Sequence, residues 1–223
     1  MASYFIHVAV AKEINKKLQR DEGMLLFGAV APDVSKCANE SRIFSHFLDD
    51  EDNNIPNIDR FLDKYKHFLN DDFVMGYFIH LYTDYLWYKY FISEIKKDGT
   101  ITKLDGSVVK LNGNMAAIYI YNDYTNLNIR LIESYDLNLE KLKNSFECEV
   151  KHIIDEIPYD KMDLLFNNMS NIISGTKNRK EYAFNIDNIN RFIGMAVELI
   201  YSEIEDVQKI INLEKESSEV IAN

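Results

Sequence analysis

The chain has 223 residues, of which 47% are hydrophobic, and it carries a formal net charge of −11. This length and apolar content allow a substantial buried core, which excludes an intrinsically disordered protein. The acidic balance disfavours stable nucleic-acid binding and docking on an anionic membrane, because both need clustered Lys and Arg. A phosphate-containing substrate stays open, since bound metal ions can supply local positive charge.

Three features bear on the location of the protein. Its two cysteines predict no disulfide framework, and no CxxC motif is present. The segment Met1–His7 lacks the basic and apolar regions of a secretory signal, and no apolar run is long enough to span a bilayer. We therefore expect a soluble, cytoplasmic protein, and the sequence contains no indication of its oligomeric state.

The first part of the chain predicts a helix and a short apolar segment. Apolar residues recur at helical spacing from Tyr4 to Leu18. The apolar stretch from Met24 to Ala31 ends at Pro32-Asp33, a pair that favours a turn. The segment from Val34 to Asn57 is irregular and polar.

Two helices are predicted next. The first covers Ile58 to Leu69, and a longer one runs from about Phe73 to Lys96, capped by Asn70 or Asp71. Gly76 lies inside the longer helix, where glycine lowers helix stability. A close approach of another helix is therefore expected at Gly76.

The rest of the chain is predicted to be helical, with one exception. Thr100 to Leu111 alternates around Asp105-Gly106 and predicts a β-hairpin. The further predicted helices are Asn114–Tyr135, Asn138–Ile157, Tyr159–Ile173 and Asp187–Leu213. We expect an all-α fold with a small β-hairpin insertion near residues 100–112. It forms a single domain over residues 1–213, followed by a charged, frayed tail over 214–223.

Five residues form a pattern suited to a divalent metal ion: His7, Asp33, His46, His80 and Asp84. His80 and Asp84 are four apart in a helix, so their side chains point to the same side. Imidazoles and carboxylates brought together bind zinc and similar ions, and a buried carboxylate is costly unless it is paired or bound to a metal. Each residue taken alone is better explained as a satisfied buried polar group or a partner in a hydrogen bond. Their joint order and types favour a metal site.

Two other groups are weaker candidates. Asp123 and Tyr124 lie in an aromatic-apolar helix and are candidates for additional metal or substrate contacts. The alternative is that Asp123 is a surface residue of an amphipathic helix. Glu149, His152 and Glu156 share a face of the predicted helix Asn138–Ile157, which is more typical of exposed charge pairs than of a metal site.

The motifs of the first 90 residues, taken together, resemble those of the zinc-dependent phospholipase C family. The matching segments are His7 in an N-terminal helix, Gly28-Ala29-Val30-Ala31-Pro32-Asp33, Ser45-His46-Phe47, and Gly76 to Asp84 with its His80-x-x-x-Asp84 spacing. The resemblance implies the helical fold that this family shares with P1-type nucleases.

The resemblance also implies roles for individual residues. Asp33, His46, His80 and Asp84 match the ligands of one zinc ion, and His7 and Asp84 match ligands of a second, with Asp84 bridging. Asp33 is then the best candidate to orient the attacking water or take its proton, in addition to any metal contact. The family's further histidines have no counterpart, because no histidine lies between Asp84 and His152. One or two ions are therefore expected instead of three.

The leading hypothesis is a metal-dependent hydrolase, with zinc as the expected cofactor, that acts on a small phosphoester or a lipid-like substrate. One alternative is a non-catalytic binding or regulatory module with a structural or vestigial metal site. A further alternative keeps the site with a different ion, such as iron or manganese, since mixed His and carboxylate ligands suit several metals.

Overall fold

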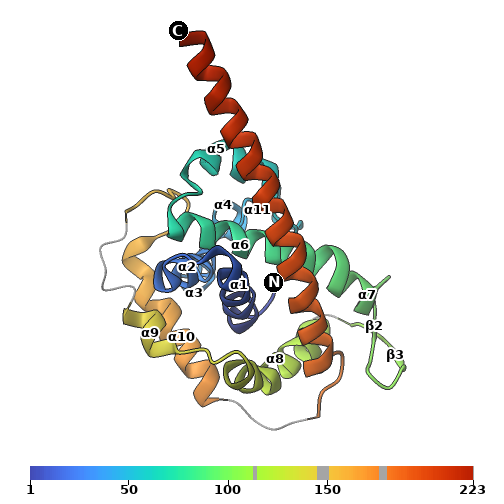
Figure 1. The fold of residues 1–223 in the computed structure, drawn as a ribbon. Coiled ribbons are helices and arrows are strands. Elements are labelled where there is room, and N and C mark those ends of the chain that lie inside the picture. The colour runs from blue at the N-terminus through green and yellow to red at the C-terminus, as the bar shows by residue number, and fades with distance from the viewer. Residues whose placement is uncertain (113–114, 145–150, 176–179, 223) are drawn as a thin grey trace.

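The structure, a computed structural model, describes residues 1–112, 115–144, 151–175 and 180–222. Helices make up 69% of it and are accompanied by one small three-stranded antiparallel sheet, which confirms the mainly helical prediction. Figure 1 shows α1 near the centre of the helical body, α8 and α9 at one end, and α5 at the opposite end. The main helices of the described residues are α1 (Tyr4–Leu18), α2 (Glu22–Gly28), α3 (Val34–Cys37), α4 (Arg42–Ser45), α5 (Ile58–Tyr65), α6 (Asp72–Leu86), α7 (Ser93–Ile95), α8 (Met115–Ser134), α9 (Leu139–Asn144), α10 (Met162–Ser174) and α11 (Ile186–Ala222).

The helices α2 and α6 cross in direct backbone contact. A Cβ atom at Gly28 would lie 2.0 Å from the carbonyl oxygen of Phe73, and one at Gly76 would lie 2.0 Å from that of Leu25. No side chain fits at either position, so the two glycines allow this approach. The close helix contact expected at Gly76 is therefore present, and α2 is the partner.

The long helical segment predicted from Phe73 to Lys96 is present with one irregularity. Asp71 caps its start by accepting hydrogen bonds from the backbone N–H groups of Phe73 (3.0 Å) and Val74 (3.3 Å). After α6 the backbone continues as a π-helical segment, Trp87–Ile92, and then as α7. π-helical turns often lie beside functional sites, and this one begins three residues after Asp84.

The predicted hairpin is present and gains one strand. β2 (Thr100–Thr102) pairs antiparallel with β3 (Val108–Lys110) around Gly106, whose φ of 80° suits glycine. A further short strand, β1 (Lys96–Lys97), pairs with β2 on its other edge.

The predicted helix Asn138–Ile157 is wrong over residues 151–157. α9 ends at Asn144, residues 145–150 lie outside the described part of the chain, and residues 151–157 are not helical. Two tyrosine hydroxyls take the place of helical carbonyls there. The N–H of Ile154 donates to Tyr159 at 3.2 Å, and that of Asp155 donates to Tyr65 at 3.0 Å. His152 and Glu156 therefore do not share a helix face as predicted, and Glu149, the third member of that group, lies outside the described residues.

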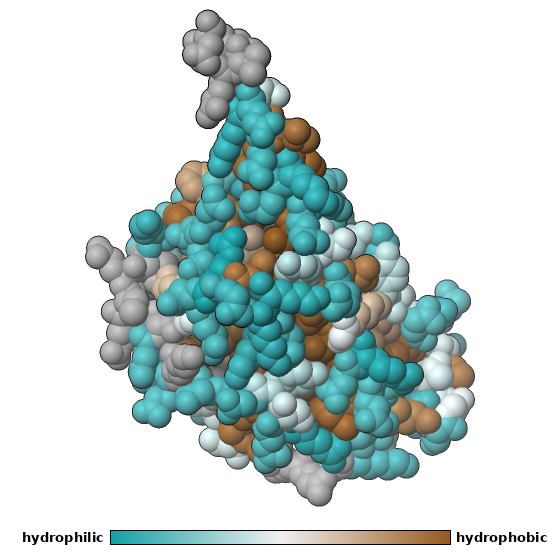
Figure 2. Space-filling view, in the orientation of Figure 1, coloured by the Kyte–Doolittle hydropathy of each residue, from teal (hydrophilic) through white to brown (hydrophobic). Residues whose placement is uncertain are grey.

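The C-terminal helix α11 runs along one side of the body and extends beyond it (Figure 1). Its buried face includes Ile189, Ile193 and Ile200, and the helix continues to Ala222. Figure 2 shows hydrophilic residues over most of the face in view, with apolar patches beside this helix. None of the helices in the described residues combines the length and apolar character that crossing a membrane requires.

Candidate metal centre

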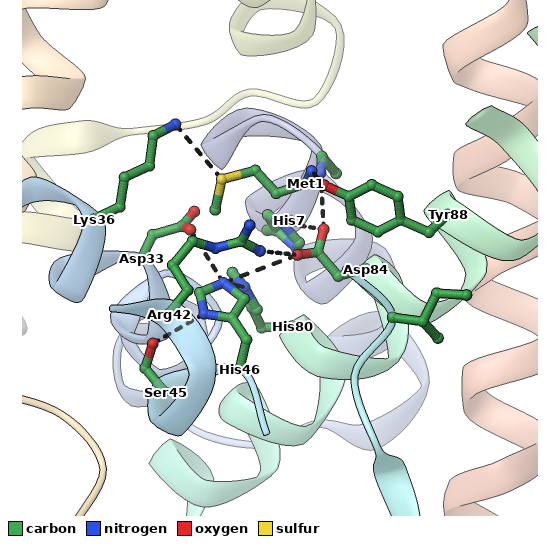
Figure 3. Close-up of polar contacts among 12 residues, drawn as sticks. Met1, His7, Asp33, Lys36, Arg42, Ser45, His46, His80, Asp84 and Tyr88 are labelled. Atoms are coloured by element: carbon green, nitrogen blue, oxygen red, sulfur yellow. Dashed lines mark hydrogen bonds and ion pairs between the residues drawn. The ribbon is translucent and has the colours of Figure 1, made fainter. Parts of the chain in front are cut away.

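The structure brings His7, Asp33, His46, His80 and Asp84 together in the interior. Each is exposed to no more than 1%. His7 comes from α1, Asp33 from a 3-10 turn (Ala31–Asp33), and His46 directly follows α4. His80 and Asp84 come from successive turns of α6. These five side chains, which Figure 3 shows at close range, are called the metal cluster below.

The metal cluster contains two overlapping groups of potential ligands. His7, His80 and Asp84 form one, and Asp33, His46 and His80 form the other, with the ligand atoms of each within 4.8 Å of one another. The rings of His7 and His80 are stacked, with centroids 3.7 Å apart and planes inclined by 13°.

The tautomer of His80 follows from its hydrogen bond to the α2–α6 crossing. Its Nδ1 lies 2.8 Å from the carbonyl oxygen of Ala29. A carbonyl can only accept, so Nδ1 carries the proton and Nε2 presents a lone pair. That Nε2 has one lone pair and serves one ion only. His80 therefore takes part in one of the two groups at a time.

His46 is oriented by its neighbour in the sequence. Its Nδ1 lies 2.9 Å from Ser45 Oγ, and its Nε2 lies 3.3 Å from Nε2 of His80 and 3.4 Å from Oδ1 of Asp33. When His46 Nδ1 donates to Ser45, both Nε2 atoms present lone pairs to each other, which a shared cation stabilises. When His46 Nε2 carries the proton instead, it donates to His80 and no metal is needed.

Asp84 is surrounded by positively polarised groups. Its Oδ1 accepts a hydrogen bond from the backbone N–H of Ala2 at 2.8 Å and lies 3.4 Å from His7 Nε2. Its Oδ2 lies 3.6 Å from the Arg42 guanidinium. The amino group of Met1 is close by and donates to the Tyr88 hydroxyl.

Several polar atoms of the metal cluster lack hydrogen-bond partners among the described residues. They are both ring nitrogens of His7, both carboxylate oxygens of Asp33 and Oδ2 of Asp84. A buried polar atom without a partner costs roughly 1–3 kcal/mol. Such a set of imidazole nitrogens and carboxylate oxygens is the donor set that zinc and related divalent ions prefer. The residues present therefore fit a metal ion.

The protonation states also favour cation binding. Burial lowers the pKa of His46 and lowers that of His80 well below its usual value, which keeps both rings neutral. Burial alone would raise the pKa of Asp33, but His46, His80 and His7 lower it to about 2. Asp84 is likewise ionised, because the Met1 amino group and His7 lower its pKa well below the usual value against the effect of burial.

Two neighbours of the metal cluster were not expected from the sequence. Arg42 precedes His46 by four positions, and this spacing, which places both on one side of a helical turn, was the available signal. Its Nε and Nη2 are buried and have no hydrogen-bond partner among the described residues. The hydrogen bonds of Met1 with Tyr88 and of Ala2 with Asp84 each join residues more than 80 positions apart, and no local pattern indicates them.

Asp123 is not in the metal cluster. Its Oδ1 accepts from the backbone N–H of Tyr182 at 2.8 Å, and its Oδ2 accepts from Ala183 at 2.6 Å and Phe184 at 3.1 Å. The residue is fully buried and fixes the segment that enters α11. The Tyr124 hydroxyl donates to the carbonyl of Met1 at 2.8 Å, and burial raises its pKa well above the usual value, so it stays neutral.

Comparison with known proteins identified no relative. No family model matches the chain, and no curated protein or solved structure matches it either.

Proposed function

We propose that this protein is a metal-dependent hydrolase of phosphoesters that uses zinc. The observation that carries the proposal is the buried meeting of three imidazoles and two carboxylates, several of whose polar atoms lack partners among the described residues. Buried polar atoms are rarely left without a partner, which is another protein group, an ordered water or an ion. The order of the motifs, which resembles that of the zinc-dependent phospholipase C family, supports the same assignment.

The proposal gives each residue of the metal cluster a role. Asp33, His46 and His80 would hold one ion, and His7 and Asp84 would hold a second, because His80 Nε2 serves only one. A zinc ion bound there would supply Lewis acidity, which polarises a phosphoryl oxygen and lowers the pKa of water. Ser45 and the Ala29 carbonyl would fix the orientation of the two rings they contact.

Asp33 is better suited to orienting a water molecule than to accepting its proton. A general base is most effective when its pKa lies near the working pH. The pKa of Asp33 is lowered to about 2, far below neutrality. Its two carboxylate oxygens are acceptors without partners among the described residues, so either can receive a hydrogen bond from water.

A non-catalytic module is the second candidate, and Arg42 is the observation that favours it. The Arg42 guanidinium, 3.6 Å from Asp84, and the N–H of Ala2 partly balance the carboxylate without any metal. A protein with this arrangement could keep the fold and serve as a binding or regulatory surface.

Metal content and hydrolysis, measured together, separate the two candidates. The protein is purified without chelator, beside the double variant His46→Ala, His80→Ala and the control His67→Ala, whose side chain is 60% exposed. We expect one or two zinc ions per chain in the wild type and the control, none in the double variant, and hydrolysis only where metal is present. A phosphomonoester and phosphodiester panel measures turnover. Zinc-loaded protein that leaves the whole panel intact supports the non-catalytic module.

A further inference from the structure

A cavity of about 200 Å³ borders the metal cluster. It lies among the N-terminal segment, α3, α8 and α10, and Asp33 forms part of its wall. Pockets for drug-sized ligands usually measure about 300–1,000 Å³. This cavity is smaller, so it suits a compact ligand and excludes a long acyl chain from its interior.

Asn128 and Ser3 belong to the cavity wall, and each has a buried polar atom, Asn128 Oδ1 and Ser3 Oγ, without a hydrogen-bond partner among the described residues. Asn128 is only 3% exposed. An amide oxygen accepts hydrogen bonds and a serine hydroxyl both donates and accepts. The group that satisfies both atoms therefore carries O–H or N–H donors.

The cavity wall also contains a cation. Nζ of Lys36 lies 3.2 Å from the Tyr121 hydroxyl and 3.5 Å from Met1 Sδ. Neither partner carries a negative charge, so the ammonium charge is available to an anion. Figure 3 shows Lys36 and Asp33 on the same side of the metal cluster.

We propose that this cavity binds a small phosphomonoester whose organic part carries hydroxyl groups, that is, a polyol phosphate. The proposal rests on the proposed function, since it names the substrate class of the same site. The phosphate lies beside Asp33 and Lys36, where metal ions and the ammonium offset its two negative charges. The hydroxyl groups donate to Asn128 and exchange hydrogen bonds with Ser3.

The test uses two phosphonates, whose C–P bond resists hydrolysis, so that binding is measured apart from turnover. The probes are 3,4-dihydroxybutylphosphonate and n-butylphosphonate, which differ only in two hydroxyl groups. Isothermal titration calorimetry on the zinc-supplemented protein gives both dissociation constants. We expect the dihydroxy probe to bind about tenfold more tightly, the effect of roughly one good hydrogen bond.

Substitutions then identify the source of the preference. Asn128→Leu should reduce it to about twofold or less without changing the affinity for butylphosphonate, and Ser3→Ala should reduce it in part. The control Asn167→Leu makes the same change at an exposed position of α10 and should leave the preference intact. Lys36→Met should weaken the binding of both probes by a similar factor. Thermal melting checks that each variant is folded.

The outcomes separate this inference from the proposed function. Hydrolysis of a simple aryl phosphate with equal affinity for the two phosphonates would keep the hydrolase and overturn the polyol assignment. A hydroxyl preference that depends on Asn128 but comes without turnover would keep the binding site and overturn the hydrolase. If neither phosphonate binds, the inference is overturned as well.

Discussion

The backbone carbonyl of Ala29 accepts a hydrogen bond from Nδ1 of His80 at 2.8 Å. This contact exists because α2 and α6 cross at Gly28 and Gly76, one residue before Ala29 and one turn before His80. The same crossing therefore sets both the packing of the core and the tautomer of a central histidine. Histidines that bind metals commonly donate their second ring N–H to a carbonyl or carboxylate in this way.

Replacing Gly76 by alanine should destabilise the protein. The new Cβ would lie 2.0 Å from the Leu25 carbonyl oxygen, so α2 and α6 must separate. Overpacking of this kind costs about 1–3 kcal/mol, and the shift should also lower zinc affinity by displacing Ala29 from His80. Urea unfolding and zinc titration measure the two effects.

The matched control for Gly76 is Gly194→Ala in α11, where a Cβ meets nothing within 4 Å. Alanine is the better helix former, so this variant should gain up to about 1 kcal/mol. Equal unfolding free energies for Gly76→Ala and the wild type would show that the crossing can relax.

The five residues of the metal cluster could be identified in the sequence because each stands in a recognisable local context. His80 and Asp84 have the helical spacing of four, and Asp33 ends an apolar run. Their common location is what the structure adds. The packing of α1 on α6, which brings His7 against His80, depends on side chains distant in sequence.

Other features of the site had no local signal or an ambiguous one. An acid in an apolar helix fits a metal or substrate contact and a surface residue equally well. The partners of Asp123 lie about 60 positions away, so only the fold distinguishes these readings. Residues 151–157 have helical composition, yet the hydroxyls of Tyr65 and Tyr159 receive the N–H groups there. Tertiary contacts of this kind override local propensity.

Asp123→Asn should lower stability without changing metal content. The amide keeps the shape but places N–H groups against the backbone donors of residues 182–184, so at least one buried hydrogen bond is lost. A cost of about 2 kcal/mol is expected. Chemical unfolding and elemental analysis measure the two quantities.

Asp52→Asn, an exposed substitution in a loop, serves as the control for Asp123 and should stay within about 0.5 kcal/mol of the wild type. Loss of zinc from folded Asp123→Asn protein would contradict a purely structural role for Asp123.

Stability of the metal-free protein should fall as the pH is lowered from 8 to 5. Burial lowers the pKa of the Met1 amino group from 8.0 to about 5, and it also lowers the pKa values of His46 and His80. Between the folded and unfolded pKa values these groups bind a proton only when the chain unfolds, so acid favours the unfolded state. Each group that gains a proton on unfolding lowers the free energy of unfolding by about 1.4 kcal/mol for each pH unit of acidification.

The two kinds of group act over different windows of pH. The Met1 amino group lowers the free energy of unfolding at pH values below its unfolded-state pKa of 8.0, and the histidines do so below their unfolded-state pKa of 6.5. The decrease of stability with falling pH should therefore become steeper below pH 6.5. Urea unfolding in chelator at intervals of half a pH unit measures the curve, and His67→Ala should reproduce it. A flat curve between pH 8 and 5 is incompatible with the buried, uncharged state of these groups.

Arg42→Met should strengthen zinc binding and weaken binding of inorganic phosphate. The Arg42 guanidinium lies 3.6 Å from Asp84 Oδ2, where its charge opposes a cation. Its Nε and Nη2 have no hydrogen-bond partner among the described residues, so they can donate to a phosphate oxygen. Removing a charge-assisted hydrogen bond costs roughly 1.5–3 kcal/mol, so phosphate affinity should fall by about tenfold or more.

Competitive zinc titration and calorimetry with phosphate measure the two changes, and the exposed Arg191→Met should alter neither. If Arg42→Met weakens the binding of both zinc and phosphate, Arg42 supports the structure of the site and does not bind the anion.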